Sequence, residues 1–186
     1  MFKNTYSIRY VLISFVFFIS MFYLINLSPV GLAHLLVITH GNSILDMSLF
    51  GYSIDKAYQI LTMLGDEGRA FNLNYIIPLD FLFPLSYGIF YFLMIRFLMH
   101  KSGIAGSITK IKYIGLIALL ADWLENICII ILLTNYPSRL NVVAQAASAC
   151  TVTKTIFIIS CISLILIGIF ALIIQNIVRR FSKLLR

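Results

Sequence analysis

Four long runs of apolar residues alternate along this chain with shorter polar stretches. They cover about residues 10–27, 75–98, 113–134 and 155–178. A helix needs roughly 20 mainly apolar residues to cross the hydrocarbon core of a bilayer, which is about 30 Å thick. The pattern predicts an all-α polytopic membrane protein, a four-transmembrane-helix bundle that forms a single membrane domain over residues 1–186.

The first run also fits a second interpretation, a cleaved signal peptide. Lys3 and Arg9 precede the run, and Gly31-Leu32-Ala33 resembles a small-x-small cleavage site. However, no Asp, Glu, Lys or Arg occurs between Arg9 and Asp46, so the run is longer than the roughly 7–15 apolar residues of a usual signal core. We therefore expect the first run to remain as a membrane helix.

Composition and charge placement agree with a membrane protein. Hydrophobic residues make up 61% of the 186 positions and charged residues only 11%, whereas a soluble domain has about 25% charged residues. The formal net charge of +7 is compatible with nucleic-acid binding, but the basic residues lie at the ends of apolar runs, where they anchor membrane helices. We predict contact with membrane lipid and no nucleic-acid partner.

The basic residues also predict an orientation. Of the 14 Lys and Arg residues, ten lie on one side of a four-span topology, and the other four are Lys56, Arg69, Arg139 and Lys154. Cytoplasmic segments of membrane proteins carry an excess of Lys and Arg. Both termini are therefore predicted to be cytoplasmic, and the segment of about residues 28–74 is predicted to be extracytoplasmic.

The segment 28–74 contains a helical pattern. Ser53 is suited to cap a helix that ends at Gly65, and apolar residues recur between them at helical spacing. We expect a short amphipathic helix that lies in the membrane interface. Asp66-Glu67 would then begin a second helix, and Pro78 is expected to kink or delay the second span.

The sequence contains no metal-binding or redox motif. His34 and His40 are six residues apart, so they do not share a helix face, and no third ligand is nearby in sequence. Cys128, Cys150 and Cys161 form no C-x-x-C pair. The G-x-S-x-G motif of hydrolases and the H-E-x-x-H motif of zinc proteases are also absent from the sequence. We predict no cofactor and no metal, and an enzyme is not favoured.

Ionisable residues inside the predicted spans are the strongest functional signal. Asp80 lies in the second span, Asp122 and Glu125 lie in the third, and Lys154 lies at the outer edge of the fourth. Each costs about 2.5–3.5 kcal/mol at the centre of a membrane helix, so these side chains should face one another or a water-filled cavity. We expect Lys154 to pair with Glu125 or Asp122, and Arg69 to pair with Asp80.

Neighbouring positions complete the candidate site. Tyr87 follows Asp80 at the spacing of one helix face, and Asn126 adjoins Glu125. The first span carries mostly large apolar residues and is expected at the periphery of the bundle. We predict a polar pocket in the outer half of the membrane, with one carboxyl group left over for a proton, water or a ligand. Its members are Arg69, Asp80, Tyr87, Asp122, Glu125, Asn126 and Lys154.

Several short motifs resemble those of a family of small four-span bacterial membrane proteins with no established activity. They are Ile44-Leu45-Asp46-Met47, Phe50-Gly51-Tyr52-Ser53, Leu64-Gly65, Gly68-Arg69, Asp80, Phe83-Pro84, Tyr87, Asp122-Trp123-Leu124-Glu125-Asn126, Tyr136-Pro137 and Lys154. The resemblance covers about residues 44–155 and implies a bacterial inner membrane, but no mechanism. In architecture alone, the chain is also similar to four-span sterol-isomerase and sigma-2-receptor-like domains, which hold lipophilic molecules.

Three classes of function are compatible with these features. One is the binding or transport of a lipid, or of a small lipophilic or cationic molecule, in an outward-facing polar pocket. Another is an accessory protein whose polar residues are structural and whose external segment contacts a membrane-protein partner. The third, an intramembrane enzyme that uses Asp122 and Glu125 as acid and base, is less favoured because no substrate can be named.

Overall fold

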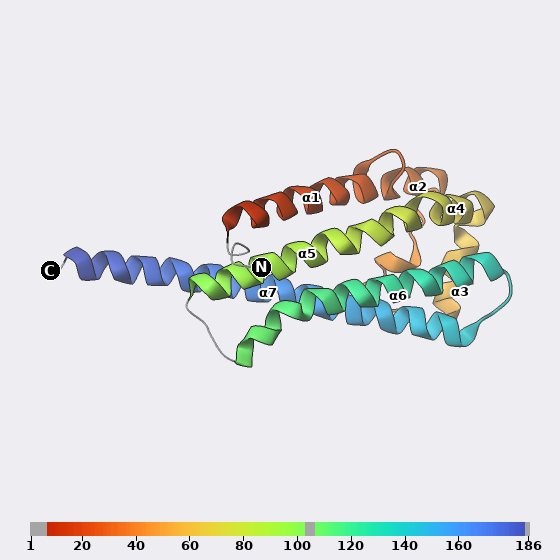
Figure 1. Cartoon of the computed structure of the whole chain (residues 1–186). Coiled ribbons are helices and arrows are strands. Elements are labelled where there is room, and N and C mark those ends of the chain that lie inside the picture. The colour runs from red at the N-terminus through yellow and green to blue at the C-terminus, as the bar shows by residue number, and fades with distance from the viewer. Residues whose placement is uncertain (1–6, 103–106, 185–186) are drawn as a thin grey trace, which may run out of the picture.

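The structure is a computed structural model that describes residues 7–102 and 107–184 (Figure 1). Every regular element within those ranges is helical, which confirms the all-α prediction. In chain order the elements are α1 Ile8–Leu27, α2 Leu32–Ile38, the 3₁₀ turn η1 Leu45–Met47, α3 Ile54–Met63, α4 Gly65–Phe71, the π-helical turn η2 Asn72–Ile76, α5 Ile77–Lys101, the 3₁₀ helix η3 Ser107–Tyr113, α6 Ile114–Asn135 and α7 Asn141–Leu184.

Four helical stretches are long and apolar enough to cross a membrane, as the hydropathy pattern predicts. They are Ile8–Ile38, Gly65–Lys101, Lys110–Asn135 and Asn141–Phe181. A helix satisfies its own backbone hydrogen bonds, so an apolar helix of this length is stable in lipid. The protein is therefore a membrane-embedded helical bundle.

Helices α5, α6 and α7 pack together, and α1 packs against α5 (Figure 1). Phe18 of α1 stacks on Phe83 and Phe90 of α5, with ring centroids 5.9 and 5.6 Å apart. Other side chains of α1, such as Ile13 and Val16, are exposed. The first span thus lies at the periphery of the bundle, in agreement with its mostly large apolar residues.

Two glycines allow α5 and α6 to approach closely. A Cβ atom added at Gly88 would lie 2.8 Å from Cδ1 of Leu119, and one added at Gly115 would lie 2.9 Å from Cβ of Tyr91. Small residues at such positions are typical of packed membrane helices. The close approach brings the inward faces of α5 and α6, with Tyr87 and Asp122, into contact.

Helix α7 is much longer than the predicted fourth span. It has 44 residues and begins at Asn141, so Lys154 lies thirteen residues inside the helix and not at its edge. The run-length prediction missed this part because it is rich in Ala, Ser and Thr, of which Ala144, Ala147 and Thr151 are buried. At 1.5 Å per residue the helix is about 66 Å long, roughly twice the thickness of the hydrocarbon core.

Helix α3 corresponds to the predicted amphipathic helix. The hydroxyl of Ser53 accepts a hydrogen bond from the backbone N–H of Lys56 at 3.2 Å, and Gly65 follows the helix with φ +64°. Its apolar face, however, is buried against other helices, because Leu61 packs in one core with Leu132 of α6 and Ala147 of α7. The hydrophobic stripe of this amphipathic helix therefore packs on protein, and the location of the helix in the membrane interface stays a prediction.

The second span begins through a continuous helical stretch. Asp66 and Glu67 lie in the first turn of α4, as predicted, and η2 connects α4 to α5. Pro78 lies in the first turn of α5 and has no N–H to donate to the preceding turn. The wider π-helical turn directly before it replaces the expected interruption, and the helix continues to Asp80.

Candidate ligand-binding site

A buried lysine occupies the centre of the bundle. Lys154 of α7 is only 5% exposed, and its Nζ lies 2.6 Å from Oε2 of Glu125 and 3.3 Å from Oδ1 of Asp122, both on α6. The same nitrogen forms an ion pair with Asp46 of η1. The expected pairing of Lys154 with Glu125 or Asp122 is thus present with both residues.

Hydroxyl groups hold the remaining oxygens of the two α6 carboxylates. Tyr87 of α5 donates to Oδ2 of Asp122 at 2.9 Å, and Thr151 of α7 donates to Oε1 of Glu125 at 2.5 Å. Lys154 and Thr151 are three residues apart on α7, as are Asp122 and Glu125 on α6, so each helix presents both groups on one face. The arrangement fixes the register of α6 against α7.

Asp80 of α5 differs from the other carboxylates. Its side chain is buried, with 3% of the residue exposed, and it forms no ion pair with a basic residue in the part of the chain that the structure describes. The amide of Asn126 donates to the main-chain oxygen of Asp80 at 2.8 Å. Carboxylate oxygens of Asp46, Asp80 and Asp122 lie within 4.8 Å of one another. Of these three carboxylates, Asp80 is therefore the one without an ion pair to Lys154, and a cation bound beside it would compensate its charge.

We call Asp46, Asp80, Asp122, Glu125 and Lys154 the buried polar cluster. The cluster contains four carboxyl groups and one ammonium group, so three negative charges would stay uncompensated if all were ionised. An unpaired charge in a protein interior costs several kcal/mol. The cluster therefore favours the uptake of protons or of a further cation.

The three aspartates have the ligand type that Mg²⁺ or Ca²⁺ prefers. Lys154, however, already binds Asp46 and Asp122, and its positive charge opposes a second cation on the same oxygens. A metal ion in this position would have to displace the lysine. The donor set thus fits a monovalent or organic cation at Asp80 better than a divalent metal ion.

Arg69 lies outside the buried polar cluster, and the predicted pair with Asp80 is wrong. Its guanidinium forms an ion pair with Asp66, donates to the carbonyl of Leu61 at 2.7 Å and lies 4.0 Å from the ring centroid of Tyr136. Asp66 is three residues earlier on α4, so a local partner on the same helix face is available. Arg69 therefore ties α4 to the ends of α3 and α6.

Sequence reasoning missed two residues near the cluster. Asp46 lies in a three-residue 3₁₀ turn with no periodic pattern, and its one signal was its place in the motif Ile44–Met47. Tyr52 lies in the following loop, where burial, followed by the charge of Glu125, raises the pKa of its hydroxyl. The phenol therefore stays protonated and remains a hydrogen-bond donor.

A cavity of about 170 Å³ adjoins the buried polar cluster. Its polar lining includes Asp46, Asp80, Asp122, Lys154 and the phenol of Tyr87. Its walls come from α1, α2, η2, α5, α7 and the segment around η1, and they are apolar except for Asn26. Among the wall residues, Phe22 of α1 is 44% exposed and Leu49 after η1 is 50% exposed, so the cavity has an exposed apolar rim. The remaining wall residues include Ile25, Leu32, Ile44, Met47, Ile76, Phe83 and Ile158.

The size of the cavity restricts its occupant. Pockets for drug-sized ligands usually have about 300–1,000 Å³, so this cavity holds a small molecule or one group of a larger, elongated molecule. Aromatic side chains at its wall, with the rings of Phe22 and Phe83 6.3 Å apart, favour an apolar or cationic group over an anion. An amphipathic molecule with a cationic end matches both the carboxylates and the apolar walls of the cavity.

The fold and the cavity together define a membrane-embedded helical bundle with an acid-rich internal site. Comparison of the chain with protein-family models, with curated proteins and with solved structures finds no match. The function is therefore inferred from the chemistry of the site alone.

Proposed function

We propose that this protein binds a small lipophilic molecule with a cationic group, such as an amine or a quaternary ammonium, in the cavity beside the buried polar cluster. The observation that carries the proposal is the position of Asp80, a buried carboxylate that lines the cavity and forms no ion pair with a basic residue among the described residues. A cationic group there would form a charge-assisted contact in a site with little competing water.

The apolar walls support the other half of the proposal. A lipophilic tail would lie between Phe22, Phe83 and Ile158. Each Å² of its apolar surface that leaves water would contribute about 25 cal/mol to the free energy of binding. The exposed apolar rim favours access from the lipid phase. A neutral sterol-like molecule would fill the walls but would leave the carboxylates without compensation.

A purely structural role is favoured for part of the cluster. Lys154 joins η1, α6 and α7, as an accessory protein with a structural polar seam would require. Asp80 has no such role, because it does not take part in these ion pairs. A test of ligand binding should therefore change Asp80 and leave Lys154 and Glu125 intact.

We further propose the topology that the basic residues predict. Both termini would be cytoplasmic, the segment of about residues 28–74 would be extracytoplasmic, and the membrane would be a bacterial inner membrane. The support is the excess of Lys and Arg around the start of α1, from the end of α5 through η3, and around the end of α7.

Binding of a defined probe tests the proposed function. The purified protein in phosphatidylcholine nanodiscs would be titrated with dodecyltrimethylammonium, and with dodecanol as the neutral molecule of equal chain length. The fluorescence of Trp123, which is the single tryptophan and adjoins Asp122, would report binding. We expect saturable binding of the cation that Asp80→Asn weakens about tenfold or more, because hydrogen bonds to charged groups contribute about 1.5–3 kcal/mol.

Asp66→Asn is the matched control, since it removes one exposed carboxylate that does not line the cavity. Thermal unfolding of each variant would establish that the fold is intact. Equal binding of the cation to the wild type and to Asp80→Asn, or equal binding of cation and alcohol, would contradict the proposal and favour a structural role for the whole cluster.

A further inference from the structure

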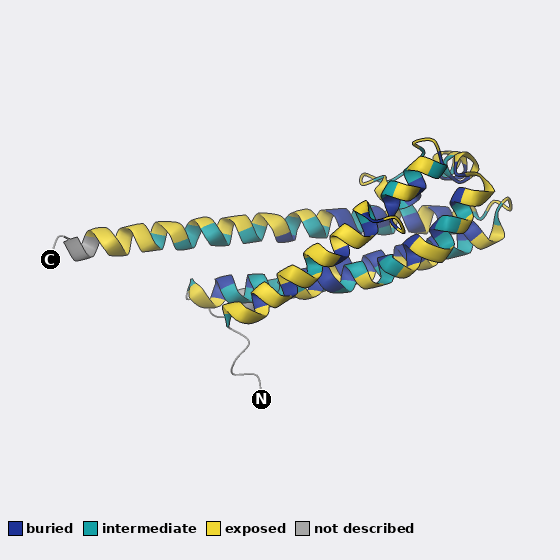
Figure 2. Ribbon diagram, turned by 90° about the horizontal axis from the view of Figure 1, so that it is seen from above, coloured by how far each residue is buried: buried dark blue, intermediate teal, exposed yellow. Residues whose placement is uncertain are grey.

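The C-terminal part of α7 projects beyond the other helices (Figures 1 and 2). Figure 2 shows exposed residues along this part, in contrast to the buried surfaces where α5, α6 and α7 meet. Two hollows lie along it. One of about 510 Å³ is lined by Ile173, Asn176, Ile177, Arg179 and Arg180, and one of about 350 Å³ is formed with the end of α5.

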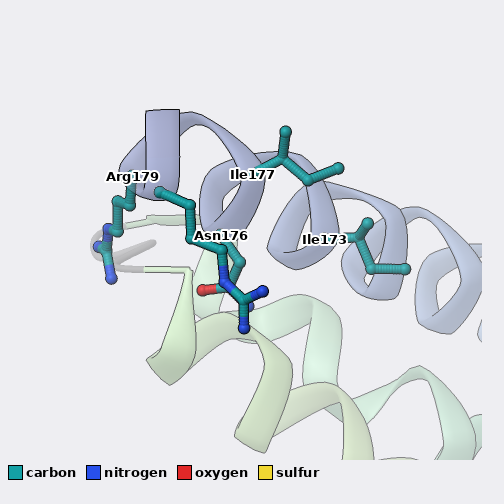
Figure 3. Close-up of a pocket in the computed structure, with 5 residues that line it drawn as sticks. Ile173, Asn176, Ile177 and Arg179 are labelled. Atoms are coloured by element: carbon teal, nitrogen blue, oxygen red, sulfur yellow. The ribbon is translucent and has the colours of Figure 1, made fainter. Parts of the chain in front are cut away.

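The two hollows form one groove, because Asn176 and Arg179 line both of them. We call it the α5–α7 groove. From α5 it receives Phe97 and Lys101, and Figure 3 shows Asn176 on the side of α7 that faces the neighbouring helix. The groove therefore combines apolar side chains, amide groups and basic groups from two helices.

The positions on α7 follow one helix face. Ile173, Asn176, Ile177 and Arg180 have the spacing i, i+3, i+4 and i+7, so an apolar stripe ends at a basic residue. Ile173 and Ile177 are each 49% exposed, which means that the stripe has no protein partner that covers it fully. An occupant of the groove would meet apolar side chains first and basic groups at the end.

The charged side chains that line the groove are all basic, namely Lys101, Arg179 and Arg180. The sequence has no Asp or Glu between Asp80 and Asp122 and none after Glu125, so the end of α5 and the C-terminal part of α7 contribute no acidic side chain. The complement of such a groove is an anion attached to an apolar body. A phospholipid with an acidic headgroup has this composition, whereas inorganic phosphate or a nucleotide would leave the apolar stripe unused.

We propose that the α5–α7 groove binds the headgroup of an acidic phospholipid, with Lys101, Arg179 and Arg180 around the phosphate and with the acyl chains along Ile173 and Ile177. Basic pockets between helices at one membrane surface are suited to acidic headgroups. This site is separate from the buried polar cluster, and it does not depend on the proposed function.

Native mass spectrometry of the full-length protein in detergent tests the site. Phosphatidylglycerol and phosphatidylcholine with identical acyl chains would be added in equal amounts, and the retained adducts would be counted. We expect a defined phosphatidylglycerol adduct on the wild type and on Lys110→Gln/Lys112→Gln. That control removes two basic residues between α5 and α6 that do not line the groove.

The double variant Arg179→Gln/Arg180→Gln is expected to bind phosphatidylglycerol about thirtyfold more weakly at low salt, since each basic residue near an acidic surface contributes about fivefold. Equal losses in both double variants would mean diffuse attraction to a basic surface and would overturn the site. Equal retention of both lipids would overturn it as well.

Two further measurements separate the sources of the anion and guard against misfolding. Displacement of phosphatidylglycerol by millimolar inorganic phosphate would show that the groove recognises the phosphate without its lipid, and it would overturn the lipid assignment. Thermal unfolding of both double variants should match that of the wild type. If Arg179→Gln/Arg180→Gln unfolds earlier, Lys101→Gln provides the same test from α5 and should weaken the adduct about fivefold.

Discussion

The ammonium nitrogen of Lys154 lies 2.6 Å from Oε2 of Glu125 and joins α7 to α6 at a buried position. Both residues are almost fully removed from solvent, so neither charge has water as an alternative partner. In such a pair the loss of one partner costs more than the loss of both, because a single charge is left without compensation. This relationship leads to the first two predictions.

Replacement of Lys154 by Met is expected to destabilise the protein by about 3–5 kcal/mol, because the carboxylates of the buried polar cluster lose their shared cation. Thermal unfolding in detergent would measure the effect. Lys56→Met is the control, since Lys56 is exposed and lies outside the cluster. A stability of Lys154→Met equal to that of the wild type would contradict the role of the ion pairs.

The double variant Glu125→Gln/Lys154→Met is expected to be more stable than Lys154→Met alone, because it removes a negative charge together with the positive one. The two changes should depart from additivity by about 0.5–3 kcal/mol, as is typical of residues in contact. A double-mutant cycle with Glu125→Gln measures this quantity. Strict additivity would mean that the two residues do not interact in the folded protein.

Asp46→Asn is expected to loosen the segment between α2 and α3, because the ion pair with Lys154 attaches η1 to the bundle. Amide hydrogen exchange in residues 44–52 should rise about tenfold or more, while exchange in α5 and α6 stays unchanged. Asp55→Asn serves as the control, because Asp55 pairs with the exposed Arg139 at 2.5 Å. Unchanged amide hydrogen exchange in Asp46→Asn would mean that the ion pair with Lys154 does not hold η1 on the bundle.

Gly51→Ala is expected to be more harmful than Gly41→Ala. Both glycines have positive φ, +83° and +88°, so both substitutions carry a backbone strain of about 1–2 kcal/mol. A Cβ atom at Gly51 would also lie 2.8 Å from Cγ2 of Val152 and 2.9 Å from Oγ of Ser148, whereas Gly41 has no such neighbour within 4 Å. The added crowding should cost about 1–3 kcal/mol in unfolding measurements. Equal effects would mean that the loop does not pack on α7 as described.

The proposed topology can be measured by cysteine labelling. In a chain whose three native cysteines are replaced by Ala, Glu67→Cys should react with an impermeant maleimide added outside intact cells, and Lys110→Cys should react only after the membrane is opened. The physical reason is the excess of basic residues on the side of Lys110. The reverse pattern of labelling would invert the proposed orientation.

The sequence by itself determined the all-α class and the four membrane-length helices. Hydrophobic length and the high cost of charge in lipid are properties of single segments, so they can be read without any knowledge of neighbours. The same reasoning selected Asp80, Asp122, Glu125 and Lys154, and the structure brings these four residues together. The capped helix from Ile54 to Met63 was also predictable, because its cap and its stop are local signals.

Only the tertiary structure decided which groups meet. Asp46 reaches Lys154 across 108 positions of sequence, and Arg69 prefers Asp66 on its own helix to the expected Asp80. The length of α7 and the packing of α3 on α6 and α7 depend on buried Ala and Thr surfaces that hydropathy does not detect. Partner choice depends on distances between segments that are remote in sequence, and no local pattern encodes those distances.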